Sequence, residues 1–393
     1  MMFRYRIFPV FAGCILLGGF GCKQKVEHSP EAELLAVNES DPEYAQRIND
    51  SSAVRPAVPF DSGAEYIDVR GVGDSAWSNL KSTTPPASGM SAALRSFDPT
   101  GKILKGDLNF INWESSVGTR CNSYYGVDYA FLSSPQAIID AFQHGFNLFG
   151  LANNHSEDCS SAIDIDGQKT SGAIASQKQM RSLSHQKSVL WHGVGPAGGS
   201  LSSPAVLTFN VKGRAVKVVF GSVAFQGWDC VDSTCEARVQ GLLNAMMNAQ
   251  GDLKILSLHS QGAEAFNRGK KWSERFVREF SGDIVFAHGP HTWAGIKVLP
   301  KPDGRAGVVF HGLGNFMHNQ VAPNPDNLIG RVLLDSKTLQ PKQVQVIPVL
   351  NNAVGVDVVL APAAKGLPKA NMEWTRAALP AHKPVPIGFA NIK

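Results

Sequence analysis

The chain has 393 residues, of which 43% are hydrophobic and 18% charged, so it can bury a sizeable core and is not globally disordered. Its 37 Lys and Arg against 33 Asp and Glu give a formal charge of +4, which is too small and too dispersed to indicate nucleic acid as a partner. The length allows one large domain or two of ordinary size.

The first 21 residues have the pattern of an export signal. Arg4 and Arg6 precede an apolar stretch, residues 7–21, that is too short to span a bilayer as a helix. Gly18-Gly19-Phe20-Gly21-Cys22 at its end resembles a bacterial lipoprotein box, in which the cysteine becomes the lipidated first residue. We therefore expect a signal peptide over 1–21, lipidation of Cys22, and an exported cell-envelope lipoprotein on a periplasmic or outer-surface face. A plain secretory signal or an uncleaved anchor is the alternative.

The rest of the chain divides by composition. After the lipidated Cys22, residues up to 62 are rich in Glu, Asp, Ser and Pro, which predicts a flexible tether over 22–62. Residues 63–350 alternate short apolar runs with amphipathic stretches, which predicts an α/β domain. Residues 351–393 are Pro- and Ala-rich and are interpreted as a C-terminal extension. The predicted strands are 66–72, 108–112, 147–151, 205–211, 216–222, 253–258, 283–287, 307–310 and 331–335. The predicted helices are 134–144, 170–184, 239–250 and 271–280.

Polar side chains stand where the predicted strands stop. In α/β sheets, binding sites lie beyond the carboxyl ends of strands, where residues from several loops face one crevice. Asp, Asn and His in such positions can bind one or two divalent ions, which activate water and hold phosphoryl oxygens. Each residue alone has a structural explanation, such as a turn, a cap or a buried histidine, so the prediction depends on their recurrence. The residues at these strand ends are Asp74, Asn112, Glu114, Asn153, Asn154, His155, His259, His288, His291, His311 and Asn315. Within this region we interpret His311 and His318 as mainly structural.

Six short motifs follow one another in the same region. They are Gly73-Asp74, Asn112-Trp113-Glu114, Leu151-Ala152-Asn153-Asn154-His155, Leu258-His259, His288-Gly289-Pro290-His291 and Leu313-Gly314-Asn315-Phe316. In identity and order they resemble the CapA family of bacterial capsule and poly-γ-glutamate synthesis proteins, over roughly residues 66–320. The resemblance implies a calcineurin-like metallophosphatase fold, in which two packed β-sheets are flanked by helices as an α/β/β/α sandwich.

The resemblance also implies roles for single residues. The implied ligands of one or two divalent metal ions (Mn, Fe, Zn or Mg) are Asp74, Asn154, His259, His288 and His291. The implied catalytic residues are His155, Asp158 and Glu114, with His155 orienting substrate or donating a proton to the leaving group, and Asp158 holding its ring. Glu114 and Asn112 are expected at or next to the metal. The implied substrate-binding residues are Asn112, Asn153 and Asn315.

Two places depart from the family's motifs. Ser75-Ala76-Trp77 follows Asp74, so a histidine is missing after the Gly-Asp motif. The segment that begins at His259 has one residue more than the usual motif and lacks its tryptophan. These departures give some support to the alternative of a non-catalytic protein.

Four cysteines remain when Cys14 and Cys22 are set aside with the leader. An even number in an exported chain predicts disulfides, with three possible pairings. Cys230 and Cys235 are close enough in sequence to close a small loop, which would leave Cys121 with Cys159. In that case Cys159 would hold the loop of Asp158 against the loop of Cys121.

We therefore expect a surface-anchored, metal-dependent hydrolase that processes an anionic envelope polymer or its ester or amide precursor. Its expected partners are that polymer, the membrane through the lipid anchor, and membrane-bound capsule synthesis proteins. Two alternatives stay open. One is a non-catalytic assembly or export factor that binds polymer or membrane partners, and the other is a periplasmic phosphoesterase. Metal-dependent turnover distinguishes the first alternative from the enzyme.

Overall fold

The computed structural model describes residues 62–126, 128–194, 201–225, 233–320, 327–349 and 351, and the backbone of three short C-terminal strands. The predicted signal peptide, Cys22, the tether up to residue 61, Cys230 and most of the predicted C-terminal extension lie outside the described residues. Among the helices in the described ranges, none is long and apolar enough to cross a membrane.

The first large sheet contains the strand that begins the domain. Its order is β10–β7–β3–β1–β18–β19–β20, with β17 beside β1 and β22 beside β19. Strands β3 and β17 run parallel to β1, and β18 runs antiparallel to it. The bounds are β1 (Tyr66–Ala76), β3 (Leu108–Trp113), β7 (Leu148–Gly150), β10 (Leu190–His192), β17 (Asn315–His318), β18 (Asn327–Asp335), β19 (Pro341–Val349), β20 (Val359–Leu360) and β22 (Ala390–Asn391).

The second large sheet has the order β11–β12–β13–β14–β16–β15–β21, with parallel pairing from β12 through β16. Its bounds are β11 (Ala205–Val211), β12 (Arg214–Ala224), β13 (Leu253–His259), β14 (Ile284–His288), β15 (Ile296–Pro300), β16 (Ala306–Phe310) and β21 (Met372–Trp374). Two small sheets complete the described strands. They consist of β2 (Ser78–Leu80), β4 (Ser116–Val117) and β6 (Phe131–Ser133), and of β5 (Arg120–Cys121), β8 (Ala162–Ile163) and β9 (Lys169–Thr170).

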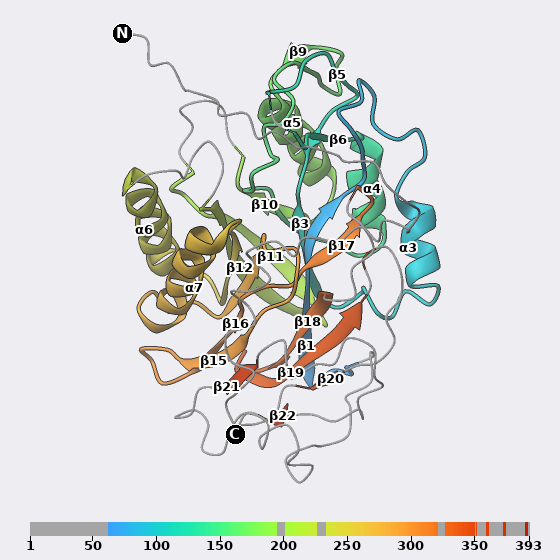
Figure 1. Cartoon of the computed structure of the whole chain (residues 1–393). Helices are drawn as coiled ribbons and strands as arrows, with labels where there is room; N and C mark the ends of the chain where they lie inside the picture. The colour runs from blue at the N-terminus through green and yellow to red at the C-terminus, as the bar shows by residue number, and fades with distance from the viewer. Residues whose placement is uncertain are drawn as a thin grey trace, which may run out of the picture.

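Helices cover the outer faces of both large sheets (Figure 1). Helices α3 (Ser91–Phe97), α4 (Pro135–Gln143) and α5 (Gly172–Gln186) share an apolar core with the first sheet. Helices α6 (Ser233–Asn248) and α7 (Ala263–Arg278) share another core with the second sheet. A third core joins the facing sides of the two sheets. The predicted α/β/β/α order of layers is confirmed.

The two sheets pack face to face through aromatic rings. Phe110 of the first sheet stacks on Phe286 of the second, with ring centroids 5.1 Å apart, and Phe286 contacts Phe310 at 5.6 Å. Gly71 faces the same ring, where an added Cβ would lie 2.4 Å from an atom of Phe286. A side chain at position 71 would therefore force the sheets apart, at a cost of about 1–3 kcal/mol. This close packing fixes the distance between the strand ends of the two sheets.

The predicted strands all coincide with observed ones, but several bounds differ. Strand β1 was predicted to end at residue 72 and continues to Ala76, because pairing with β3 and β17 satisfies its backbone beyond the apolar run. Helix α7 begins at Ala263, eight residues before its predicted start. Helix α4 begins as predicted, since Ser134 accepts a hydrogen bond from the Ala137 amide and Pro135 occupies the first turn. The sequence prediction did not include α3, nor the strands β2, β4, β5, β6, β8, β9, β10, β15, β17, β19, β20, β21 and β22.

Candidate metal centre

Two histidines end neighbouring parallel strands of the second sheet. His259 is the last residue of β13 and His288 the last of β14, and the two are direct partners in the strand register. Both are fully buried, and their Nδ1 atoms lie 3.0 Å apart. The Oγ of Ser257 lies 2.9 Å from His288 Nε2, which orients that ring. The prediction placed both residues just after their strands, but they belong to the strands themselves and are held by the ladder.

Asp74, on β1 of the first sheet, contacts both histidines. The register between β1 and β3 shifts at Gly73, and a bulge of this kind re-aims the residue that follows it. Gly73 has no substitute here, because an added Cβ would lie 1.9 Å from the Gly314 carbonyl oxygen. The Asp74 Oδ1 lies 3.2 Å from His288 Nδ1 and 3.5 Å from His259 Nδ1. Asp74, His259 and His288 are named the first group below.

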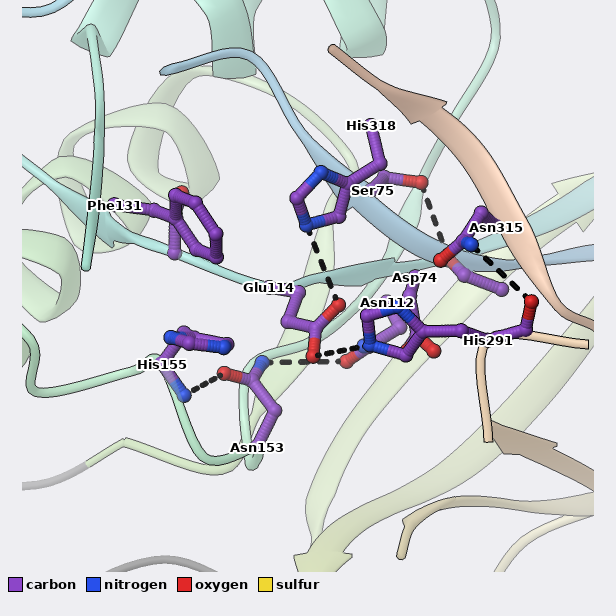
Figure 2. A network of polar contacts seen from close by, with 12 residues as sticks. Asp74, Ser75, Asn112, Glu114, Phe131, Asn153, His155, His291, Asn315 and His318 are labelled. Carbon is purple, nitrogen blue, oxygen red and sulfur yellow. Dashed lines mark hydrogen bonds and ion pairs between the residues drawn. The ribbon is translucent and has the colours of Figure 1, made fainter. Parts of the chain in front are cut away.

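A second group shares Asp74 and adds Glu114 and His291. Glu114 follows β3, its amide donates to the Ser75 carbonyl at 2.7 Å, and its side chain is fully buried. Its Oε1 lies 3.7 Å from His259 Nε2. The same oxygen lies 3.7 Å from His291 Nε2 (Figure 2). Among the described residues, neither carboxylate oxygen of Glu114 has a hydrogen-bond partner. His291 is 29% exposed, so it is the accessible member of the two groups.

These residues fit divalent metal ions. A buried carboxylate without a hydrogen-bond donor is strongly destabilising unless a cation accompanies it. Ligand atoms that bind one ion at about 2.0–2.2 Å lie roughly 3–4 Å from each other, which matches the 3.7 Å from Glu114 to each of these imidazoles. Mixed imidazole and carboxylate ligands suit borderline ions such as Zn, Mn or Fe. Because Asp74 belongs to both groups, the arrangement has room for a pair of ions that share this carboxylate.

The protonation states support the same conclusion. Burial by itself would raise the pKa of Asp74, but His259 and His288 hold the pKa of this carboxyl well below its usual value. For Glu114, burial and the Asp74 charge act upward, but His291 and His259 hold its pKa below the usual value. Burial lowers the pKa of His288, against the upward effect of Asp74, and so favours the neutral ring. Ionised carboxylates and neutral imidazoles are the forms that bind metal ions.

His155 and Asp158 form a pair at the edge of the site. The His155 Nδ1 lies 2.7 Å from Asp158 Oδ2, and the same oxygen accepts a hydrogen bond of 2.6 Å from the Phe131 amide. Burial acts to lower the pKa of His155, but Asp158 and the charge of Glu114 raise it above its usual value. Burial also raises the pKa of Asp158. The Phe131 ring lies 4.5 Å from the His155 ring and forms an apolar wall beside it.

The predicted disulfide between Cys121 and Cys159 is present, with the two Cα atoms 5.8 Å apart. The Tyr125 amide donates to the Asp158 carbonyl at 3.0 Å in the same region. The disulfide therefore joins the end of β5 to the loop that carries His155 and Asp158. Cys235 is also in a disulfide, and Cys230 lies outside the described residues.

The four predicted asparagines differ in their contacts. Asn112 donates to Asp74 Oδ1 at 2.7 Å, so it holds a candidate ligand. Asn153 donates to the Trp113 carbonyl at 2.8 Å and accepts from the His155 amide at 3.0 Å, which shapes the loop. Asn315 donates to the His291 carbonyl at 3.2 Å. Asn154 donates to Gln261 Oε1 at 2.6 Å, and its own Oδ1 has no hydrogen-bond partner among the described residues. The roles of these residues at the metal and substrate stay predictions.

The structure adds one residue that was interpreted as structural. His318 is fully buried on β17, with its Nε2 3.7 Å from Glu114 Oε2 (Figure 2). Burial lowers its pKa to about 4. A histidine three residues after Asn315 was visible in the sequence, but only the pairing of β17 with β1 brings it to Glu114. His311, the other such histidine, lies 3.5 Å from Glu274 and outside both groups.

The sequence and the structure of the chain were compared with those of known proteins. No curated protein sequence matches it. Among solved structures, it is similar to a novel phosphatase from Mycoplasma pneumoniae, with 11% identity, a TM-score of 0.42, and coverage of 73% of this chain and 95% of that one. A hypothetical protein from Thermus thermophilus gives 12% identity, a TM-score of 0.40, and coverage of 71% and 97%. The family model described as "Bacterial capsule synthesis protein PGA_cap" matches residues 71–320, so the chain belongs to this family.

Proposed function

We propose that this protein is a metal-dependent hydrolase that acts on an ester or amide of an anionic envelope polymer or its precursor. The observation that carries the proposal is the Glu114 carboxylate, which is fully buried and has no hydrogen-bond donor among the residues that the structure describes. The imidazoles of His259 and His291 lie 3.7 Å from it. Such a carboxylate requires a cation. The description of the family as capsule synthesis proteins supports the choice of polymer.

The two groups would hold one or two divalent ions, with Asp74 as the shared ligand. Such ions activate water and bind the oxygens of a phosphoryl or carbonyl group. In the proposed reaction, His155 donates a proton to the leaving group from Nε2, because Asp158 occupies its Nδ1. The raised pKa of His155 favours this role, since a proton donor must keep its proton near neutral pH.

The direction of substrate approach follows from exposure. Asp74, Glu114, His259 and His288 are fully buried, whereas the His291 side chain is 29% exposed. A polymer would therefore reach the ions from the side of His291. His155, 8% exposed, would meet the leaving group at the same opening.

The place of action is part of the proposal. We propose export, lipidation at Cys22 and tethering of the domain to a membrane, on the strength of the N-terminal sequence pattern. A tether of about 40 residues would let the domain reach polymer and membrane-bound synthesis partners near the membrane surface.

The test combines metal content with turnover in the purified full-length chain. Elemental mass spectrometry should find one or two transition-metal ions per chain, and Glu114→Gln should lower that number. Glu264→Gln is the matched control, because the Glu264 side chain is 90% exposed and forms an ion pair with Arg268 at 3.0 Å. The substrates are bis(p-nitrophenyl) phosphate and poly-γ-glutamate, with Mn²⁺ supplied.

The outcomes separate the candidates. Metal binding with turnover that Glu114→Gln abolishes supports the hydrolase. Metal binding with no turnover of either substrate favours the non-catalytic assembly factor. A chain that holds no metal, even after refilling, contradicts the metal site and with it the proposed reaction.

A further inference from the structure

The two groups differ in their numbers of carboxylate and imidazole ligands. The first has one carboxylate and two imidazoles, whereas the second has two carboxylates and only the imidazole of His291. His318 Nε2 lies 3.7 Å from Glu114 Oε2, and the His318 ring centroid lies 6.1 Å from that of His291. We propose that His318 supplies a second imidazole to the second group and is a ligand of the ion held there. The inference rests on the proposed function and names a residue of the same site.

The backbone of β17 is bent to present His318. Asp74 pairs with Asn315 and Ala76 pairs with His318, so β17 has one residue more than β1 between the same two pairs. Within this bulge, Met317 has a φ of 50°, a left-handed conformation that is unusual for a residue with a side chain. Such a conformation costs of the order of 1 kcal/mol. It persists where the surrounding contacts hold it in place, and it is common at functional sites. Here the bulge turns the imidazole of His318 toward Glu114 (Figure 2).

Other contacts hold the residue in this position. The Asn351 side chain clamps the His318 backbone, accepting from its amide at 3.0 Å and donating to its carbonyl at 2.9 Å. The Phe131 ring meets the His318 ring edge-on, with centroids 5.0 Å apart. Phe131 also contacts His155, so one ring positions two imidazoles. Ligands that are fixed before binding raise metal affinity, since less freedom is lost.

The position of His318 also accounts for a departure noted in the sequence. After Asp74, the first strand has Ala76 in place of a polar side chain, and Ala76 is the register partner of His318. The imidazole that β1 lacks thus comes from the neighbouring strand. With His318 included, each group has two imidazoles, which favours borderline transition metals over Mg²⁺ or Ca²⁺ at both positions.

The experiment measures Mn²⁺ binding by the full-length chain with calorimetry and elemental mass spectrometry. His318→Phe keeps the ring volume and removes the nitrogens, and His318→Gln is the second variant if the first does not fold. His311→Phe is the matched control, because His311 is also a buried histidine, but its carboxylate neighbour is Glu274, at 3.5 Å, and not Glu114. Circular dichroism checks that each variant is folded. His288→Ala, which alters the first group, is measured in parallel.

We expect the parent and His311→Phe to bind two Mn²⁺ ions. A folded His318 variant should bind one ion as before and the other at least about 10-fold more weakly. A folded His318 variant that binds both ions with parental affinity overturns the inference, and so does equal weakening of both ions. If the parent itself binds no metal, the proposed function fails, and this result is distinct from the failure of His318 alone.

Discussion

The first and second groups share Asp74, but the fold builds them in different ways. His259 and His288 are adjacent in the register of two parallel strands, and their positions follow directly from the ladder. Glu114 and His291 stand on loops that leave different sheets, and His291 has a φ of 57°. The histidines of the first group are therefore positioned by the geometry of the sheet. Glu114 and His291 of the second group are positioned by the conformations of the loops that follow β3 and β14.

Exposure follows the same division. All side chains of the first group are fully buried, and only the second group reaches the surface, through His291. The first group, which is rigid and buried, suits an ion that stays firmly bound. The second group, which is accessible to solvent, suits an ion that contacts the substrate. The predictions below test this division, from the largest expected effect to the smallest.

Asp74→Asn should affect both groups at once. The variant keeps the size of the side chain but loses the charge that the two groups share. We expect loss of both ions and a fall in hydrolytic rate of at least about 10³-fold, since the activated water depends on them. Elemental mass spectrometry and single-substrate kinetics measure the two effects. Retention of one full equivalent of metal would show that the groups do not share this carboxylate.

His155→Ala should lower kcat by about 10²–10⁴-fold while leaving metal content unchanged. Asp158→Asn should have a smaller effect, about 10–100-fold, because it disturbs the orientation of His155 without removing the ring. Steady-state kinetics with an ester that has a poor leaving group is the sensitive assay. An activated ester has a leaving group that needs no proton. If His155→Ala lowered kcat equally with such an ester, the result would argue against proton donation by His155.

His288→Ala and His291→Ala compare the two groups directly. Removing the buried His288 should weaken metal binding and also destabilise the fold by about 2–4 kcal/mol, because it leaves a cavity and removes one of the partners of Asp74. Removing the partly exposed His291 should weaken one ion by about 10–100-fold with less than about 1 kcal/mol of destabilisation. Urea unfolding of the metal-free variants separates stability from binding. Equal destabilisation by both would contradict the division described above.

Removal of the Cys121–Cys159 disulfide should mainly affect the loop beside the second group. The bridge closes 38 residues of chain, and its loss from a Cys121→Ser, Cys159→Ser double variant should lower the free energy of unfolding by about 2–4 kcal/mol. Tight binding at the first group should persist, because the disulfide contacts neither β13 nor β14 in the strand pairing. Denaturant unfolding and Mn²⁺ calorimetry measure the two quantities. Loss of metal at both positions would be the contrary result.

The smallest expected effect lies away from both groups, at the buried His311. Burial acts to raise the pKa of Glu274, but His311 and Lys297 hold it at about 2, against 4.5 for an ordinary glutamate. Because the pKa is lower in the folded protein, this pair stabilises the fold above pH 4.5 and loses its effect as the pH falls toward about 2. Over that range the parent should lose about 1 kcal/mol more than Glu274→Gln, after allowance for solvent screening. Urea unfolding at several pH values checks this difference.

Much of the fold could be predicted from the sequence, because buried strands appear as short apolar runs. The strand of residues 205–211 was predicted with its observed bounds, and helix α4 began where Ser134 and Pro135 indicated. Strand β17 was not predicted, since its four residues are too few and too polar to show a period. The start of α7 was placed too late, because its first half contains Gly269, a weak helix former, and has Phe266 as its one large apolar residue.

For the candidate site, the sequence by itself determined which residue types stand at the strand ends and in what order. Asp74, Glu114, His259, His288 and His291 could be singled out because polar residues at the close of apolar runs are local features. Only the tertiary structure decided which of them meet: the packing of the two sheets brings Asp74 to both histidine-bearing strand ends, and the bulge in β17 brings His318 to Glu114. Contacts between strands that are far apart in the chain depend on sheet order and register, which no local pattern contains.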